Sequence, residues 1–307
     1  MKKYFGIPYK NLASKLHFGC FMDLQPILNE LDLNITRYEP VHGGDINESY
    51  CLFDNDRKYF LKLNDASRFI GMFEKEARGL AALNTALQSC NSIFIPAVLK
   101  QGIINHQQYL LLQWIPAGSP QKGFWETFGN AIALLHKQHG EFFGWHEDNY
   151  IGSLNQKNTK HRLWHTFFTE CRIMPLVQLL YNNNSLSKQD ILHAEAFCRQ
   201  CGQIFPTEPS SMLHGDLWGG NFMTTTNNKA AIFDPAVYYG HREMDIGMTK
   251  LFGGFDQRFY EAYDAEYPLQ PQWLQRLPFT QLYPLLVHAV LFGGHYCGRA
   301  RSILQQF

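Results

Sequence analysis

The sequence lacks an excess of either charge. Lys and Arg together number 27, as do Asp and Glu, so the formal net charge is zero. A chain without a net positive field does not attract nucleic acid or anionic membrane over a long range, and no Lys/Arg-rich run supplies such a field locally. We therefore expect no nucleic-acid partner, although a local basic pocket for phosphate is compatible with this balance.

Long apolar runs are also absent. No stretch reaches the roughly 18 apolar residues that a membrane-spanning helix needs. The first residues are basic but lack the continuous apolar core of a secretory signal. Organised patterning begins near Met22, so residues 1–22 are set apart as an N-terminal extension. We expect a cytoplasmic chain with no membrane partner.

Cysteine is scarce for a disulfide framework, with seven residues in a chain of 307. Cys198 and Cys201 have the CxxC spacing of metal and redox sites, but no second CxxC accompanies them and their surroundings have a helical pattern. His136 and His139 have helical ligand spacing without an acidic or cysteine partner nearby in sequence. We expect reduced thiols and structural histidines at these four positions.

Strands around one helix are predicted between about residues 35 and 113. The runs TRYEPV, ESYCLF and KYFLKLN are short and alternate in polarity, which is typical of strands. In the third, Leu61 and Lys62 face opposite ways because successive strand side chains alternate. Helical spacing predicts a helix over residues 72–87, and IPAVLKQGI and QYLLLQWI predict two further strands.

The pattern changes at a break formed by Pro116, Gly118 and Pro120. Beyond it, helices are predicted in FWETFGNAIALLHKQH, LWHTFFTECRIMPLVQLLY and QDILHAEAFCRQCGQI, and a hairpin in FMTTT-NN-KAAIFD. The predicted fold class is α+β, with a small β-rich N-lobe over residues 23–115. A larger α-rich C-lobe follows over residues 116–307.

Gly43 and Gly44 lie in a turn between two predicted strands, where a backbone without side chains can approach phosphates closely. The alternative is that Gly43 and Gly44 form a turn that has no part in phosphate binding. The sequence holds neither a GxGxxG fingerprint nor a Walker loop, so neither a Rossmann fold nor a P-loop enzyme is predicted.

Lys62 lies in an apolar strand, where burying its ammonium without a partner is costly. Glu76, in the following helix, is the expected partner, and Glu74 is the competing acid that helical geometry points elsewhere. The alternative is a lysine at a strand edge whose ammonium reaches water.

Asp216 and Asn221 are separated by five positions in LHGDLWGGNF, residues 213–222. This is the spacing of the base and the metal-binding amide in the catalytic loop of protein kinases. Asp234, after the predicted hairpin, is placed where a second metal ligand is needed, and a carboxylate with an amide oxygen suits Mg²⁺. Phosphoryl transfer needs these parts together with a phosphate-binding cation.

These residues resemble the fructosamine (ketosamine) 3-kinase family, within the wider aminoglycoside phosphotransferase and choline-kinase-like group. The resemblance lies in HGDLWGGN, in FDPAVYYGHREMDIGMTKLFGGF (residues 233–255), and in segments 143–158 and 282–296. It extends from about residue 23 to the C-terminus. It implies a two-lobed protein-kinase-like fold that uses ATP and Mg²⁺ to phosphorylate the 3-hydroxyl of a ketosamine, which frees the glycated amine.

The resemblance also implies roles for individual residues. Asp216 would be the catalytic base, and Asn221 and Asp234 the Mg²⁺ ligands. Lys62 and Glu76 would hold the phosphates. The adenine-contacting hinge would comprise Gln113, Trp114 and Ile115; His214 and Asp245 would support the catalytic loop; and Asp148 and Asn149 would contact substrate.

The chain departs from the family pattern at Asp45, where some members carry a cysteine, so no disulfide switch is expected there. Trp218 either packs the catalytic loop against the larger lobe or faces the substrate. Two other functions stay open: a kinase of another small hydroxyl compound, such as an aminoglycoside or choline, and a non-catalytic nucleotide-binding regulator. The expected partners are small or protein-bound glycated amines.

Overall fold

The computed structural model describes residues 24–41 and 46–307. The predicted extension over residues 1–22 and the predicted phosphate turn at Gly43 and Gly44 lie outside the described residues, as does Asp45.

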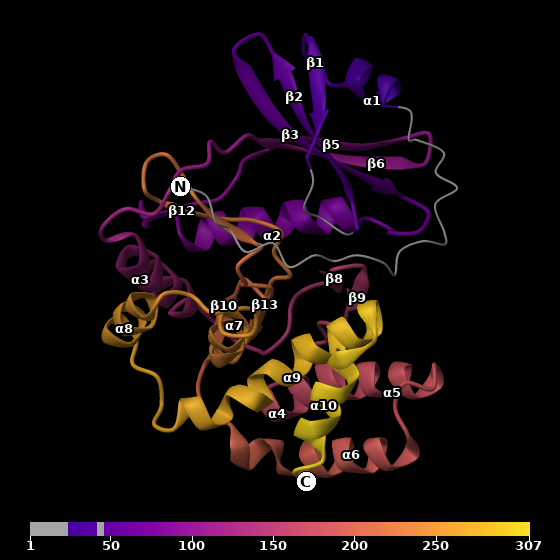
Figure 1. The fold of residues 1–307 in the computed structure, drawn as a ribbon, viewed down its shortest axis with the longest axis vertical. Coiled ribbons are helices and arrows are strands. Elements are labelled where there is room, and N and C mark those ends of the chain that lie inside the picture. The colour runs from indigo at the N-terminus through magenta and orange to yellow at the C-terminus, as the bar shows by residue number, and fades with distance from the viewer. Residues whose placement is uncertain (1–23, 42–45) are drawn as a thin grey trace.

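The N-lobe is a five-stranded antiparallel sheet with a helix on each face (Figure 1). Its order is β1-β2-β3-β6-β5. The elements are α1 (Gln25–Glu30), β1 (Arg37–Pro40), β2 (Glu48–Asp54), β3 (Arg57–Asp65), α2 (Met72–Ala86), β5 (Val98–Ile104) and β6 (Gln107–Gln113). The strands and the helix predicted from the sequence are confirmed, whereas α1 was not predicted.

Strand alternation gives each face of this sheet its own core. Leu61 and Leu63 of β3 pack with Ile27 of α1 in one cluster. Leu110 and Leu112 of β6 pack with the apolar side of α2 in another. Lys62 lies between Leu61 and Leu63, so its side chain faces α2, as the alternation predicts.

The C-lobe is mainly helical, which confirms the predicted fold class. Its helices are α3 (Phe124–His136), α4 (Trp164–Phe168), α5 (Met174–Asn182), α6 (Lys188–Ile204), α7 (Glu243–Thr249), α8 (Gln257–Glu266), α9 (Trp273–Phe292) and α10 (His295–Leu304). The helix predicted across residues 163–181 is interrupted by a π-helical turn, η1 (Thr169–Ile173). The boundary between residues 115 and 116 stays a prediction.

Short strands surround the loops of the C-lobe. They are β7 (His139–Gly140), β8 (Asn149–Ile151), β9 (Leu154–Gln156), β10 (Ser210–Leu213), β11 (Phe222–Thr224), β12 (Ala230–Ile232) and β13 (Tyr238–Gly240). The predicted hairpin is β11–β12. β4 (Ile93–Phe94), from the N-terminal part of the chain, pairs in parallel with β12 and so joins the two lobes.

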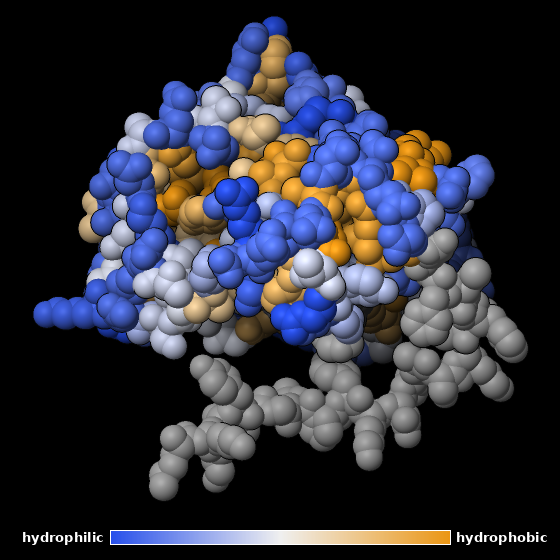
Figure 2. Space-filling view, turned by 90° about the horizontal axis from the view of Figure 1, so that it is seen from above, coloured by the Kyte–Doolittle hydropathy of each residue, from blue (hydrophilic) through white to orange (hydrophobic). Residues whose placement is uncertain are grey.

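The surface at the N-lobe end is mostly hydrophilic, with hydrophobic side chains between the polar ones (Figure 2). Large hydrophobic residues of this lobe that are exposed include Tyr38, Ile70, Leu99 and Ile103. Within residues 24–41 and 46–307, no helix has the length and apolar character needed to cross a bilayer.

Candidate active site

Lys62 is the centre of a buried ion cluster between the lobes. Its Nζ lies 2.8 Å from both carboxylate oxygens of Glu76 on α2 and 2.9 Å from Oδ1 of Asp234 in the C-lobe. The Lys62 residue is only 3% exposed, so it is not a lysine at a strand edge whose ammonium reaches water. The two acids hold the ammonium at the cleft.

The two acids keep the buried Lys62 ammonium charged. Burial opposes the charged form of Lys62, but Asp234 and Glu76 outweigh burial and raise its pKa above the usual value. Burial raises the pKa of Glu76, and the charge of Lys62 opposes that rise. Lys62 therefore stays positively charged, which is what a phosphate-binding group needs.

The loop that the sequence predicts to be catalytic, here called the catalytic loop, begins where β10 ends. Gly215 has a φ of +83°, and the carbonyl oxygen of Ala236 occupies the space that a Cβ would need. Asp245, in the first turn of α7, accepts hydrogen bonds from the backbone N–H groups of His214 at 2.8 Å and Gly215 at 2.9 Å. These contacts place the loop in a defined position directly before Asp216.

His214 connects the catalytic loop to the segment that carries Asp234. Its Nε2–H donates to the carbonyl of Phe233 at 3.0 Å, and its Nδ1 accepts the N–H of Asp216 at 3.3 Å. Burial lowers the pKa of His214, and the Asp245 charge opposes this effect. A neutral imidazole with its proton on Nε2 satisfies both bonds.

Asp216 and Asn221 are in contact, as their spacing predicts. The Asn221 Nδ2 donates to the Asp216 carboxylate at 2.8 Å and to the Asp216 carbonyl at 2.9 Å. Burial raises the pKa of Asp216 to about 7; the bond from Asn221 opposes the rise, and Asp234 and Asp245 add to it. A carboxyl with a pKa near neutrality is well matched to accepting a proton.

Asp234 has a left-handed backbone with a φ of +55°. Asp is among the few residues other than Gly that tolerate this region. The preceding Phe233 donates its N–H to the carbonyl of Asn221 at 3.1 Å, which brings Asp234 beside the catalytic loop. The Asp234 side chain is 44% exposed even with Lys62 bound to one oxygen.

A metal ion at this site would depend on few protein ligands. Because Asn221 uses its Nδ2 on Asp216, its amide oxygen is the atom left for a cation. In the part of the chain that the structure describes, no group of three or more His, Cys, Asp or Glu could hold a metal. One amide oxygen and the Asp234 carboxylate fit Mg²⁺, which typically keeps water and phosphate oxygens in its shell.

Asp148 and Asn149, which are predicted to contact substrate, have different surroundings in the structure. Asp148 accepts the N–H of Asn158 at 2.7 Å. Asn149 is buried: its Nδ2 donates to Val237 at 2.8 Å, and its Oδ1 accepts from Gln156 and Asn158. Asn149 therefore holds the β8–β9 hairpin against the segment after Asp234, and its role in substrate contact stays a prediction. Gln156 and Asn158 contact Asn149 only in the folded chain, so the sequence pattern does not identify them as its partners.

Trp218 is half-buried and packs edge-to-face on Phe252, with ring centroids 5.5 Å apart.

At the expected adenine-contacting hinge, Gln113 ends β6 and donates its N–H to the carbonyl of Ala97 at 2.9 Å. Trp114 and Ile115 are half-buried beyond it, and the Trp114 ring lies 6.5 Å from that of Phe60. The roles of Gln113, Trp114 and Ile115 in adenine contact stay predictions.

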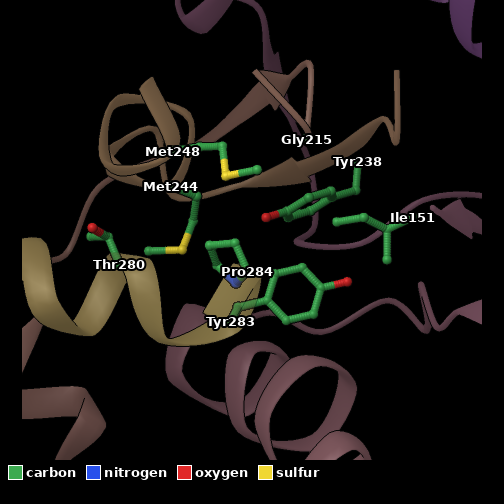
Figure 3. Close-up of a pocket in the computed structure, with 8 residues that line it drawn as sticks. All are labelled: Ile151, Gly215, Tyr238, Met244, Met248, Thr280, Tyr283 and Pro284. Atoms are coloured by element: carbon green, nitrogen blue, oxygen red, sulfur yellow. The ribbon is translucent and has the colours of Figure 1, made fainter. Parts of the chain in front are cut away.

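A narrow pocket lies below the catalytic loop (Figure 3). Gly215 forms its edge, and Tyr238 and Tyr283 face it from β13 and α9. The Tyr283 hydroxyl donates to Gln156 at 2.7 Å. The rest of the lining is largely apolar and comprises Ile151, Met244, Met248, Thr280 and Pro284.

An ion cluster that joins two lobes, a loop with an aspartate bonded to an asparagine, and a second aspartate beside them define a kinase-like phosphotransferase. The family follows from comparison with known proteins. The chain belongs to the fructosamine kinase family, whose model matches residues 27–307. It is a ketosamine kinase, a phosphotransferase with an alcohol group as acceptor.

Among its relatives is a probable ketoamine kinase of Enterococcus faecium, 36% identical over 93% of this chain and 100% of the relative. The crystal structure of a "putative fructosamine-3-kinase" from Haemophilus somnus has a TM-score of 0.79 and 28% identity, over 89% of this chain and 91% of that one. An aminoglycoside phosphotransferase, in a ternary complex with AMP-PNP and hygromycin B, has a TM-score of 0.61 at 14% identity over 92% and 98%. This last likeness shows the fold alone.

Proposed function

We propose that this chain transfers the γ-phosphoryl group of ATP to the 3-hydroxyl of a ketosamine, a fructosamine or ribulosamine adduct of an amine. The observation that carries the proposal is the hydrogen-bonded pair Asp216–Asn221 beside Asp234 and the Lys62–Glu76 ion pair. The family supplies the substrate class. The structure of the aminoglycoside phosphotransferase with AMP-PNP supports ATP as the donor for this fold.

The site residues have distinct tasks in this proposal. Lys62, oriented by Glu76, binds phosphate oxygens of the donor. Asp216 accepts the proton of the 3-hydroxyl as that oxygen attacks the γ-phosphorus, and the bond between the γ-phosphorus and the leaving phosphate oxygen breaks. Asn221 orients the Asp216 carboxylate through Nδ2, and Asp245 holds the loop that carries both.

The oxygens of Asn221 and Asp234 would hold Mg²⁺. When bound, the ion supplies positive charge to the phosphate oxygens and to the leaving diphosphate. Because Asp234 also binds Lys62 in this structure, the lysine must share this carboxylate or move from it to the phosphates. Phosphorylation at the 3-hydroxyl makes the adduct unstable, so release of the free amine is the expected outcome of turnover.

Release of ADP is the direct test. With Mg·ATP and a synthetic fructosamine or ribulosamine, the protein should release ADP in a sugar-dependent manner and free the amine. Asp216→Asn should reduce this turnover by at least about 100-fold, since general-base contributions are of this size, while nucleotide binding stays close to that of the wild type.

Aminoglycoside and choline acceptors serve as comparison substrates in the same assay. ADP release with either of them but not with a ketosamine would favour the other small-hydroxyl kinase. Nucleotide binding without turnover on any acceptor would favour a regulator. Unchanged turnover in Asp216→Asn would show that another group is the base.

A further inference from the structure

Three aromatic-Gly-Gly triplets occur in the C-lobe. They are Trp218-Gly219-Gly220 in the catalytic loop, Phe252-Gly253-Gly254 after α7, and Phe292-Gly293-Gly294 between α9 and α10. The segments are separated by more than thirty residues from one to the next in the printed sequence. Each triplet thus places one aromatic ring directly before a pair of glycines.

The rings of the triplets are brought together through His288 of α9. The Phe252 ring lies 5.5 Å from that of Trp218 and 4.8 Å from that of His288. His288 in turn lies 5.6 Å from Phe292 and 5.0 Å from Tyr296. We refer to this group as the aromatic platform; it comprises Trp218, Phe252, His288, Phe292 and Tyr296.

The platform has an open side. Phe292 is 52% exposed, although its ring also contacts that of His288. Gly253, Gly254, Gly293 and Gly294 all have positive φ values, and among residues 24–41 and 46–307 a Cβ on any of them would meet no atom within 4 Å. These four glycines form turns beside the rings and place no side chains of their own over them.

The platform is continuous with the active site. It begins at Trp218, two residues after Asp216. At its far end, a Cβ on Gly152, in the β8–β9 turn, would lie 3.0 Å from Leu291 and 3.4 Å from Ile46 of the N-lobe. The end of α9 is therefore beside β8 and β9 at the junction of the lobes (Figure 1).

We propose that the aromatic platform binds the amine-derived half of the ketosamine and favours amines that carry an aromatic or long apolar group. This inference rests on the proposed function. With the 3-hydroxyl at Asp216, the sugar occupies the catalytic loop and the amine substituent extends away from it along the rings. The platform contains no carboxylate or lysine, and burial lowers the pKa of His288, so the neutral rings offer apolar and π contacts rather than ion pairs.

Two fructose adducts with different amines test this inference. One is the adduct of benzylamine and the other the adduct of glycine, which share the sugar and differ in the amine substituent. The wild type should have a higher kcat/KM for the benzylamine adduct. In Phe292→Ala this preference should fall by about fivefold, which is the effect of one aromatic contact, and the loss should lie in KM because the ring is remote from the reacting atoms.

Leu274→Ala is the matched control, because Leu274 is a 58% exposed hydrophobic residue at the opposite end of the same helix. It should retain the wild-type preference, and Phe292→Trp, which keeps a ring, should retain most of it. Equal changes for the two adducts in Phe292→Ala, or no preference in the wild type, would overturn the inference alone. If the wild type phosphorylates neither adduct, the proposed function fails and this inference fails with it.

Discussion

At the scale of single residues, the Trp-Gly-Gly of the catalytic loop combines two different glycines. In the part of the chain that the structure describes, a Cβ on Gly219 would meet no atom within 4 Å, whereas a Cβ on Gly220 would collide with the indole ring of Trp218. The ring therefore folds back over Gly220, immediately before Asn221. Gly220 is needed for the packing of Trp218, and no described neighbour constrains Gly219.

This difference leads to a paired prediction. Gly220→Ala should displace Trp218 and shift Asn221, and a shift of about 1 Å at a catalytic group can reduce turnover by about 100-fold. Gly219→Ala should retain activity within about threefold of the wild type. Sugar-dependent ADP release, with thermal unfolding to verify folding, measures both. Equal losses in the two variants would show that the loop needs glycine for its backbone freedom and not for the contact with Trp218.

The sequence predicts those parts of the site that depend on local spacing. The offset of five between Asp216 and Asn221 already indicates that they meet, and the alternation of β3 indicates that Lys62 faces α2. The bond between Lys62 and Asp234 joins residues 172 positions apart, so only the assembled lobes reveal it. The burial of Asn149 could not be predicted from the sequence either, because its hydrogen-bond partners depend on how the β8–β9 hairpin packs on Val237.

At the scale of secondary-structure elements, alternation and helical spacing predict most of the N-lobe, because each of its strands has one face on a core. The C-lobe was predicted only in part. The sequence pattern of residues 163–181 is helical throughout, but the chain there forms a π-helical turn. In this turn Arg172 is buried with its guanidinium 4.2 Å from the ring centre of Tyr238, a tertiary contact that periodicity cannot reveal.

The position of α7 depends on a buried ion pair. Arg242 precedes the first residue of α7, is 1% exposed, and donates to both carboxylate oxygens of Glu208 at 2.7 and 2.9 Å. Glu208 lies just before β10, the strand that leads into the catalytic loop. The pair thus joins the helix that carries Asp245 to the strand that leads to Asp216.

We expect Glu208→Gln to destabilise the protein by about 3 kcal/mol at pH 7, because it leaves Arg242 buried without its counter-charge. For a chain of this length the fall in Tm is about 5 °C. Burial raises the pKa of Glu208, but Arg242 and His241 outweigh burial and lower it below 4.5. The stabilisation is therefore complete above about pH 4.5 and is lost as the pH falls through the lowered pKa.

The difference in Tm between the wild type and Glu208→Gln should therefore become smaller as the pH falls. Glu266→Gln is the control, because Glu266 pairs with Lys137 at the surface, with both side chains 37% exposed, and such pairs contribute little. A difference that stays constant from pH 7 to pH 3 would show that the loss comes from packing and not from the charge of Glu208.

At the scale of the whole molecule, two of the described contacts between the lobes differ in kind. β4 of the N-lobe pairs with β12 of the C-lobe through the backbone. Within the site, Lys62 of the N-lobe binds Asp234 of the C-lobe. The first kind involves the backbone and is independent of ligand, whereas the second uses the two groups that the proposed reaction assigns to phosphate and metal.

The Lys62–Asp234 contact leads to a prediction about magnesium. A ligand at 100 times its Kd stabilises the folded state by about 2.7 kcal/mol, about 4 °C in Tm for this chain. In the wild type, ATP with Mg²⁺ should raise Tm more than ATP with a chelator. Asp234→Ala should remove this magnesium-dependent increment, because it removes the only carboxylate that we assign to the metal. Binding of ATP without Mg²⁺ should persist, since Lys62 keeps Glu76 and is freed for the phosphates.

Asp32→Ala is the matched control for loss of a carboxylate, because the Asp32 side chain is 92% exposed and lies in the N-lobe away from this ion cluster. It should keep the full magnesium-dependent increment. If Asp234→Ala also keeps it, the metal is held elsewhere and Asp234 serves only to position Lys62. If the variant instead loses binding of ATP both with and without Mg²⁺, the contact between the lobes is itself required for the nucleotide site, and Lys62 cannot hold phosphate when Glu76 is its sole partner.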